Sequence, residues 1–79
     1  MINSKILTEK DIGRWVEYKS VFDPICEIGR IKSWEGNLIF VVYKCNNDWE
    51  NFMNYTGCGT HCASLKFIEP PKEQVKILP

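Results

Sequence analysis

The sequence predicts a small all-β domain, an SH3-like barrel of about five antiparallel strands with one or two short helical turns. The chain has only 79 residues, of which 44% are hydrophobic and 13% aromatic, as expected for one small core built from large side chains. Short runs of β-branched and aromatic residues alternate with turn signals. Short antiparallel strands in so small a chain bury both faces by curling, which favours a barrel.

The chain is expected to form a single domain over residues 1–79. No internal repeat, low-complexity segment or linker divides it. The proline pair Pro70-Pro71 ends the last predicted strand, and a flexible tail is expected from about residue 72 to residue 79.

A helical turn and a strand are the first expected elements. Residues 8–13 have the pattern of one helical turn, in which Thr8 caps the start, Asp11 occupies the capping-box position and Gly13 takes the left-handed exit. Residues 14–19 (RWVEYK) alternate aromatic and β-branched side chains and predict a strand. A loop over 21–24 follows, because Pro24 excludes a central strand there.

A β-hairpin over residues 26–44 is the clearest element, with its turn at Glu35, Gly36 and Asn37. A loop of even length assigns the side chains to two faces. The expected core face contains Ile31, Leu38, Phe40 and Val42, with the small residues Gly29 and Ser33. The other face contains Ile28, Arg30, Lys32, Trp34, Ile39, Val41 and Tyr43.

The pattern changes again after the hairpin. Residues 48–55 (DWENFMNY) place apolar side chains at helical spacing and predict a short helical turn. Two glycines in residues 57–62 (GCGTHC) break any helix and predict a loop. Residues 63–69 then predict a short closing strand.

Several of these segments resemble a known group of proteins. DIGRWVEYK, EIGRIKSWEGNLIFVVYKCNNDWENFMNYTG and LKFI are similar to small uncharacterised proteins encoded by tailed bacteriophages, over about residues 11–68. Residues 29–34, 40–43 and 49–56 are the most specific parts. The resemblance implies a viral origin, action inside a bacterial host and no enzymatic activity. The sulfur-rich segment 57–62 departs from the pattern, so the resemblance implies no metal site there.

The expected location is the cytoplasm of the bacterial host, without a membrane partner. Residues 1–7 contain no apolar run of signal-peptide length. No other stretch approaches the roughly 20 apolar residues of a transmembrane helix. In such a compartment thiols stay reduced, which disfavours structural disulfides.

The segment GCGTHC holds two of the four cysteines and the only histidine. The Cys58-x-x-His61 spacing suits two ligands of a tetrahedral zinc ion. A hairpin turn centred on residues 35 and 36 would place Cys26 opposite Cys45, which completes an alternative zinc site of Cys26, Cys45, Cys58 and His61. Disulfides, or buried free thiols, are the other interpretations. Because no paired CxxC motif is present, the favoured prediction is no cofactor and no metal.

The aromatic and basic face of the hairpin is the favoured binding surface. It combines Arg30, Lys32, Trp34 and Tyr43, and the predicted helical turn adds Trp49 and Tyr55. Such side chains stack on nucleobases, grip phosphates or contact acidic partners. In the alternative interpretation the aromatic rings pack under the helical turn and the cations extend outward.

The sequence favours a non-enzymatic binding module. It contains no close carboxylate pair, no GxGxxG motif and no P-loop. A host or phage protein, for example a bacterial defence factor that this chain inhibits, is the main hypothesis for the partner, because Trp, Tyr and Arg dominate interface energetics. Binding of a nucleic acid or nucleotide through the same face is one alternative, although 10 basic and 10 acidic residues leave no overall cationic charge. A zinc-stabilised scaffold is the other.

Overall fold

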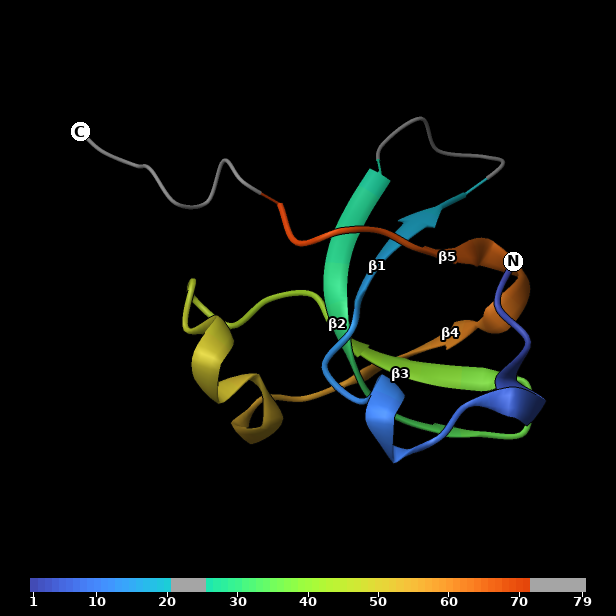
Figure 1. Ribbon diagram of the computed structural model, residues 1–79. Helices are drawn as coiled ribbons and strands as arrows, with labels where there is room; N and C mark the ends of the chain where they lie inside the picture. Colours follow the sequence, from blue (N-terminus) through green and yellow to red (C-terminus); the bar gives the residue numbers. More distant parts are fainter. Residues whose placement is uncertain (21–25, 72–79) are drawn as a thin grey trace.

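The computed structural model describes residues 1–20 and 26–71 of the chain. The predicted loop over 21–24 and the predicted tail over 72–79 lie outside the described residues. Five antiparallel strands form one sheet in the order β4-β3-β2-β1-β5 (Figure 1). The predicted all-β class, with about five antiparallel strands in a small barrel-like domain, is confirmed.

The strands are short except for β2, and short 3-10 turns precede β1, separate β3 from β4, and separate β4 from β5. The strands are β1 (Trp15–Lys19), β2 (Cys26–Glu35), β3 (Leu38–Val42), β4 (Cys58–His61) and β5 (Leu65–Phe67). The described residues contain four 3-10 turns, against the one or two expected: η1 (Ser4–Ile6), η2 (Glu9–Asp11), η3 (Trp49–Asn54) and η4 (Cys62–Ser64).

The connection through η4 shows that the sheet is strongly curled. In a flat five-stranded sheet, four inter-strand spacings of about 4.8 Å would separate the edge strands by about 19 Å. The link from His61 at the end of β4 to Leu65 at the start of β5 contains four Cα–Cα steps, which reach about 14 Å at most. The two edges therefore approach each other, as in a barrel.

Two local elements have the predicted chemistry. Thr8 caps η2, and a capping box joins it to Asp11: the Thr8 side chain accepts a backbone N–H bond, and Asp11 Oδ2 accepts one from Thr8 N at 2.9 Å. Gly13 then adopts a φ of +93°. The hairpin turn lies within the expected segment of Glu35, Gly36 and Asn37, but it is centred one residue later than residues 35 and 36. Glu35 pairs with Leu38 across a two-residue loop in which Gly36 has a φ of +61°.

A β-bulge in β2 overturns the predicted assignment of hairpin faces. The register shifts between Ile31 and Ser33, so that Ile31 pairs with Val41 and not with Val42. One extra residue reverses which side of the sheet the following side chains occupy. Ile31 therefore packs with Val41 and Ile39, while Leu38, placed on the core face by the sequence pattern, is 44% exposed.

The predicted register that placed Cys26 opposite Cys45 is wrong. Cys26 lies at the far end of β2, where its cross-strand partner is Lys19 of β1. The β2–β3 ladder ends at Arg30 and Val42, and Cys45 lies beyond β3. β2 thus pairs with β1 through its first half and with β3 through its second half. The bulge between Ile31 and Ser33 bends the strand, and β2 is visibly curved in Figure 1.

The predicted loop over residues 57–62 is also wrong, because Cys58–His61 form strand β4. β4 pairs with β3 along its whole length, and Gly59 lies opposite Phe40. A Cβ atom on Gly59 would lie 3.3 Å from the Phe40 ring, and one on Gly57 would lie 3.0 Å from Phe40 Cβ. The two glycines therefore let the backbone pack closely against Phe40, whereas the sequence pattern indicated only a break.

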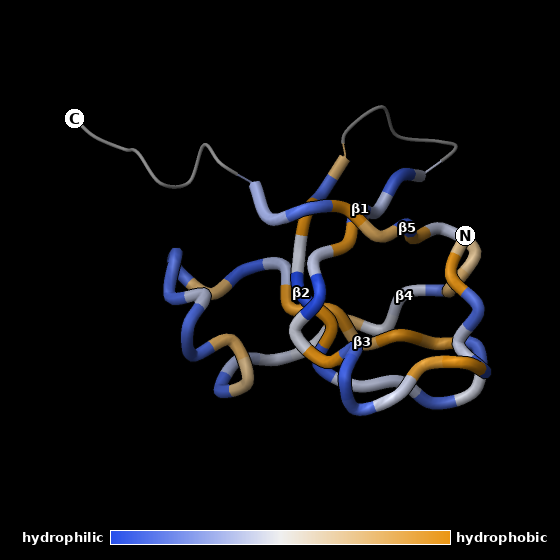
Figure 2. The backbone as a smooth tube through the Cα atoms, viewed as in Figure 1, coloured by the Kyte–Doolittle hydropathy of each residue, from blue (hydrophilic) through white to orange (hydrophobic). Residues whose placement is uncertain are grey.

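The buried side chains form two clusters. The main core combines Ile2, Val16, Ile31, Ile39, Val41 and Leu65, and it lies inside the curled sheet. A second cluster of Val42, Cys45 and Phe52 lies beneath η3. The adjacent residues Val41 and Val42 are both fully buried because they face opposite sides of β3. Figure 2 shows the hydrophobic residues concentrated in the strands, whereas the segment around η3 is mainly hydrophilic.

Candidate functional site

The guanidinium of Arg30 binds backbone carbonyl groups of the protein itself. Its Nε atom donates to the carbonyl oxygen of Gly13 at 2.7 Å, and Nη1 donates to that of Trp49 at 2.9 Å. The guanidinium carbon lies 4.4 Å from the centre of the Phe52 ring and 5.3 Å from the Trp15 ring. Arg30 therefore joins β2 to the start of β1 and to η3.

Lys32 and Trp49 also hold η3 against the sheet. The Lys32 ammonium donates to the carbonyl oxygen of Tyr55 at 2.7 Å. The Trp49 ring contacts that of Trp15, with their centres 4.7 Å apart. Trp34, which also belongs to the predicted surface, is partly buried against the main core. These contacts give four of the six predicted site residues a structural role.

The other two predicted residues, Tyr43 and Tyr55, line a groove. Two adjoining pockets, of about 450 and 300 Å³, share the residues Glu27, Tyr43 and Cys58. The larger pocket adds Lys44, Tyr55 and Thr56. The smaller adds Tyr18, Gly59, Thr60, His61 and Ser64. We call these two pockets together the tyrosine groove.

The strand pairing explains how the centre of the tyrosine groove is built. Tyr18 of β1 lies directly opposite Glu27 of β2, so their side chains share one face of the sheet. Gly29 shares that face two residues further on, and a Cβ there would lie 3.0 Å from the Tyr43 ring. The Tyr43 ring therefore covers Gly29 and meets the Tyr18 ring, with centres 6.3 Å apart and planes at 66°.

The Tyr43 hydroxyl is fixed by β4. It lies 2.9 Å from Thr60 Oγ1, and Thr60 Oγ1 donates to the carbonyl oxygen of Cys58 at 3.2 Å. Since the single Thr60 proton is used there, Tyr43 acts as the donor to Thr60. Burial raises the pKa of Tyr43 to about 12, and negative charge on Cys58 and Glu27 adds to the rise while the bond to Thr60 opposes it. Tyr43 therefore stays neutral and rigidly placed at physiological pH.

At the other end of the groove, Tyr55 is positioned by Asp48. The Tyr55 hydroxyl donates to Asp48 Oδ2 at 3.2 Å, and Asp48 Oδ1 accepts a bond from Asn51 Nδ2 at 2.9 Å. Desolvation, followed by the bond to Asp48, raises the pKa of Tyr55. Asn46 and Asn47, with φ values of 55° and 66°, turn the chain from β3 into this segment.

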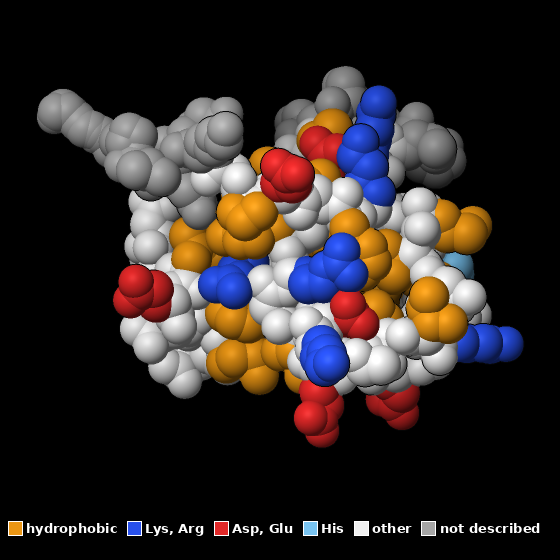
Figure 3. Space-filling model, in the orientation of Figure 1, with side chains coloured by type: hydrophobic (Ala, Val, Ile, Leu, Met, Phe, Trp, Pro, Cys, Tyr) orange, Lys and Arg blue, Asp and Glu red, His pale blue; other side chains and the backbone are white. Residues whose placement is uncertain are grey.

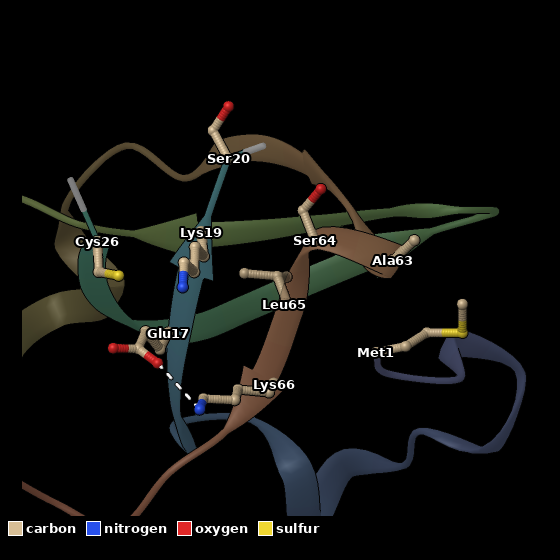
Figure 4. A pocket seen from close by; sticks show the side chains of 9 residues that line it. All are labelled: Met1, Glu17, Lys19, Ser20, Cys26, Ala63, Ser64, Leu65 and Lys66. Carbon is tan, nitrogen blue, oxygen red and sulfur yellow. Dashed lines mark ion pairs between the residues drawn. The ribbon is translucent and has the colours of Figure 1, made fainter. Parts of the chain in front are cut away.

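A further pocket of about 420 Å³ lies beside β1 and β5 (Figure 4). Its charged side chains include Glu17 and Lys66, which form an ion pair of 3.3 Å. No aromatic residue belongs to its described lining, which consists of Met1, Glu17, Lys19, Ser20, Cys26, Ala63, Ser64, Leu65 and Lys66. The tyrosine groove is the stronger candidate, because it combines large rigid rings with fixed polar groups.

The four residues of the alternative zinc site do not come together. Cys26 pairs with Lys19, Cys45 is buried beside Val42 and Phe52, and Cys58 and His61 lie on β4. Residues three apart on a strand face opposite sides, so the Cys58-x-x-His61 spacing no longer converges on one ion. Within residues 1–20 and 26–71, no group of three or more His, Cys, Asp or Glu side chains is placed to bind a metal ion. All four cysteines are free thiols.

His61 has a local structural role in the connection between β4 and β5. Its Nδ1 atom accepts a hydrogen bond from the backbone N–H of Ala63 at 3.1 Å, which caps η4. The turn is also tied to the rest of the fold, because Ile2 N donates to the Cys62 carbonyl and Cys62 N donates to the Asn37 carbonyl.

Charges of both signs are mixed on the surface. On the face drawn in Figure 3, Lys and Arg side chains are interspersed with Asp and Glu. Arg14 lies 3.0 Å from Asp11 and also stacks on Phe67, with 3.5 Å between the guanidinium carbon and the ring centre. This face therefore presents no large region of a single sign.

Comparisons with known proteins identify no relative. No protein-family model matches the chain, and searches of curated proteins and of solved structures found no significant match. In the part of the chain that the structure describes, no helix is long and apolar enough to cross a membrane.

Sequence reasoning missed Tyr18 and Glu27 as site residues. Both belong to predicted strands, but their contact depends on the register between β1 and β2, and the segment between these strands contains no two-residue turn signal that defines it. The alternation Glu17-Tyr18 and Glu27-Ile28 indicates only that each strand has a polar position. The pairing itself is a tertiary feature.

Proposed function

We propose that this protein is a non-enzymatic binding module that holds an extended peptide segment of a partner protein in the tyrosine groove. The observation that carries the proposal is the convergence of Tyr18, Tyr43 and Tyr55, from three separate segments, on adjoining pockets. Tyrosine rings supply large contact area with little loss of conformational entropy. Two adjoining pockets that share three residues suit a strand-like segment, because successive side chains of such a segment can occupy both pockets.

The mixed environment of the groove supports a protein partner. Rings, a carboxylate at Glu27 and an ammonium at Lys44 lie within one site. A peptide provides apolar and charged groups at regular intervals, so it can match all three. The surface first expected from the sequence retains Tyr43 and Tyr55 in this proposal, whereas Arg30 and Lys32 serve to position the segment that carries Tyr55.

The nucleic-acid alternative has weaker support. Phosphate binding needs donors that face outward, and the donors of Arg30 and Lys32 described above are directed to carbonyl oxygens of Gly13, Trp49 and Tyr55. Titration with single-stranded oligonucleotides at low salt tests this alternative. Binding that survives there and falls steeply with added salt would favour it over a peptide.

The resemblance to proteins of tailed bacteriophages supports a partner from the bacterial host or the phage. The proposed site of action is accordingly the host cytoplasm, and inhibition of a host defence factor is a function that fits a small module without catalysis. Binding of a peptide in the tyrosine groove can be measured without knowing which protein supplies the peptide.

Selection from a random peptide library tests the proposal directly. Selected peptides should bind the protein in calorimetry, and the Cys58→Trp variant, which fills the groove from the exposed Cys58 position, should abolish binding. Cys26→Trp is the matched control, because Cys26 is also an exposed strand cysteine but lies outside the groove. Equal binding to both variants, or no enriched peptide at all, would refute the proposal.

A further inference from the structure

The tyrosine groove has a negative centre. Glu27 lines both of its pockets and lies directly opposite Tyr18 in the strand register. The ion pairs within the described residues are Arg14 with Asp11 and Lys66 with Glu17, so the Glu27 carboxylate has no cationic partner there. This exposed carboxylate is therefore available to pair with a cationic group in the groove.

Aromatic rings flank this carboxylate. The faces of aromatic rings carry partial negative charge, so they attract cations within about 6 Å of the ring centre. Tyr18 and Tyr43 meet edge to face, with planes at 66°, and both line the same pocket as Glu27. The negative charge of Glu27 contributes to the raised pKa of the Tyr43 phenol. A carboxylate next to two rings is the chemistry that recognises a positively charged side chain.

We propose that the tyrosine groove selects peptide segments with an arginine or lysine side chain, which contacts Glu27 between Tyr18 and Tyr43. This inference rests on the proposed function and names the class of ligand for the same groove. The cationic side chain forms a salt bridge with the carboxylate and stacks on a tyrosine ring.

The position of Lys44 sets the direction of the segment. Lys44 lines only the pocket that contains Tyr55 and Thr56, whereas Glu27 also lines the pocket that contains Tyr18. The cation of the ligand therefore lies toward the Tyr18 end, away from the like charge of Lys44.

A titration with two nearly isosteric peptides tests the inference. The probe is the capped heptapeptide Gly-Val-Ala-Arg-Ala-Val-Gly, and its control replaces arginine with the neutral analogue citrulline. Each is added to isotopically labelled protein, and amide NMR shifts at the groove residues are followed to saturation. The arginine peptide should bind about fivefold more tightly, and 1 M salt should remove most of that difference.

Two charge-neutralising variants locate the cation. Glu27→Gln should weaken binding of the arginine peptide about three- to fivefold and leave the citrulline peptide unchanged. Lys44→Gln is the comparison of opposite sign: it removes a positive charge from the groove lining, so the arginine peptide should bind more tightly. Glu27 is exposed, so its replacement leaves the core intact.

The inference fails if the two peptides bind equally, or if Glu27→Gln has no effect on arginine binding. It also fails if a heptapeptide with glutamate in the central position binds best and loses affinity in Lys44→Gln. Library peptides that lack a cation, yet bind wild type and not Cys58→Trp, would overturn this inference while leaving the proposed function standing. Failure of the library selection itself would remove the proposed function.

Discussion

Nη1 of Arg30 donates a 2.9 Å hydrogen bond to the carbonyl oxygen of Trp49 and so ties the middle of β2 to η3. The same guanidinium donates to Gly13 and packs on the Phe52 ring. A cation on a sheet face usually indicates a surface for ligands, but here it is one of the main supports of the fold. The tyrosine groove depends on this support, because η3 leads directly into Tyr55.

We expect Arg30→Lys to lower the free energy of unfolding by about 2 kcal/mol, because a lysine cannot make both carbonyl bonds and loses the planar contact with Phe52. Urea denaturation followed by tryptophan fluorescence measures the change. Arg14→Lys is the control: this exposed arginine forms an ion pair with Asp11 and stacks on Phe67, and its replacement should cost less than about 1 kcal/mol. Equal losses in the two variants would contradict the structural role of Arg30.

Gly29→Ala should be strongly destabilising, at about 3 kcal/mol. A Cβ at this position would lie 2.5 Å from both Val41 Cγ1 and the Val42 carbonyl oxygen, and 3.0 Å from the Tyr43 ring. Gly36→Ala is a useful comparison because its Cβ meets nothing within 4 Å and only the φ of +61° opposes it. That variant should lose about 1 kcal/mol, and Gly36→Asn should recover most of the loss. Thermal melts that rank Gly36→Ala below Gly29→Ala in stability would disprove the close packing of β3 and Tyr43 on Gly29.

Thiol labelling should divide the four cysteines by burial. Cys26 and Cys58 are exposed and should react rapidly with a disulfide reagent, Cys62 more slowly, and Cys45 only on unfolding. Cys45 is 2% exposed, and burial raises the pKa of its thiol, which further reduces its reactivity. Mass spectrometry of the labelled peptides gives the order. Fast labelling of Cys45 in the native protein would show that the second cluster opens readily.

Stability should fall at alkaline pH as Tyr43 ionises. The folded-state pKa of about 12 lies above the ordinary value of about 10, so the native state retains a proton that the unfolded chain has lost. The associated stabilisation is complete below pH 10 and disappears as the pH rises toward 12. Because the ring is only half buried, we expect a loss of about 1 kcal/mol. Denaturation at pH 9 and pH 11.5 measures it.

Tyr43→Phe provides the control for this effect. The variant loses the hydrogen bond to Thr60, worth about 1 kcal/mol, at every pH. Its further loss between pH 9 and pH 11.5 should be smaller than that of the wild type. An identical decline in the two proteins would assign the alkaline transition to other groups.

Features that depend on neighbouring residues were predictable. The capping box of Thr8 and Asp11, the left-handed Gly13 and the two-residue hairpin loop at Gly36 all follow from a few adjacent side chains and the backbone angles that they permit. Alternating β-rich runs were enough to identify β1, β2 and β3. The all-β class with about five short strands followed from the same local patterns and the length of the chain.

Features that depend on how one strand packs against another could not be predicted from the sequence. The bulge near Lys32 reverses the faces of the hairpin, yet the only turn former next to it is Ser33, and the residues around it continue the β pattern. In the sequence alone Gly57 and Gly59 predict a loop. A glycine that accommodates a neighbouring ring has the same sequence signature as one that bends the chain, and only the contact with Phe40 distinguishes them.

The candidate site also combines features that the local sequence predicts with features that depend on strand packing. Local sequence patterns are enough to place Tyr43 and Tyr55 in aromatic segments after the hairpin turn, with Arg30 and Lys32 in the preceding strand. Strand packing in three dimensions is needed to show that both cations bind backbone carbonyls, and that Tyr18 and Glu27 join Tyr43 in a groove. The difference arises because secondary structure reflects short-range backbone preferences. The partner of a side chain, by contrast, depends on strand register and curvature, which form only when the whole sheet closes around its core.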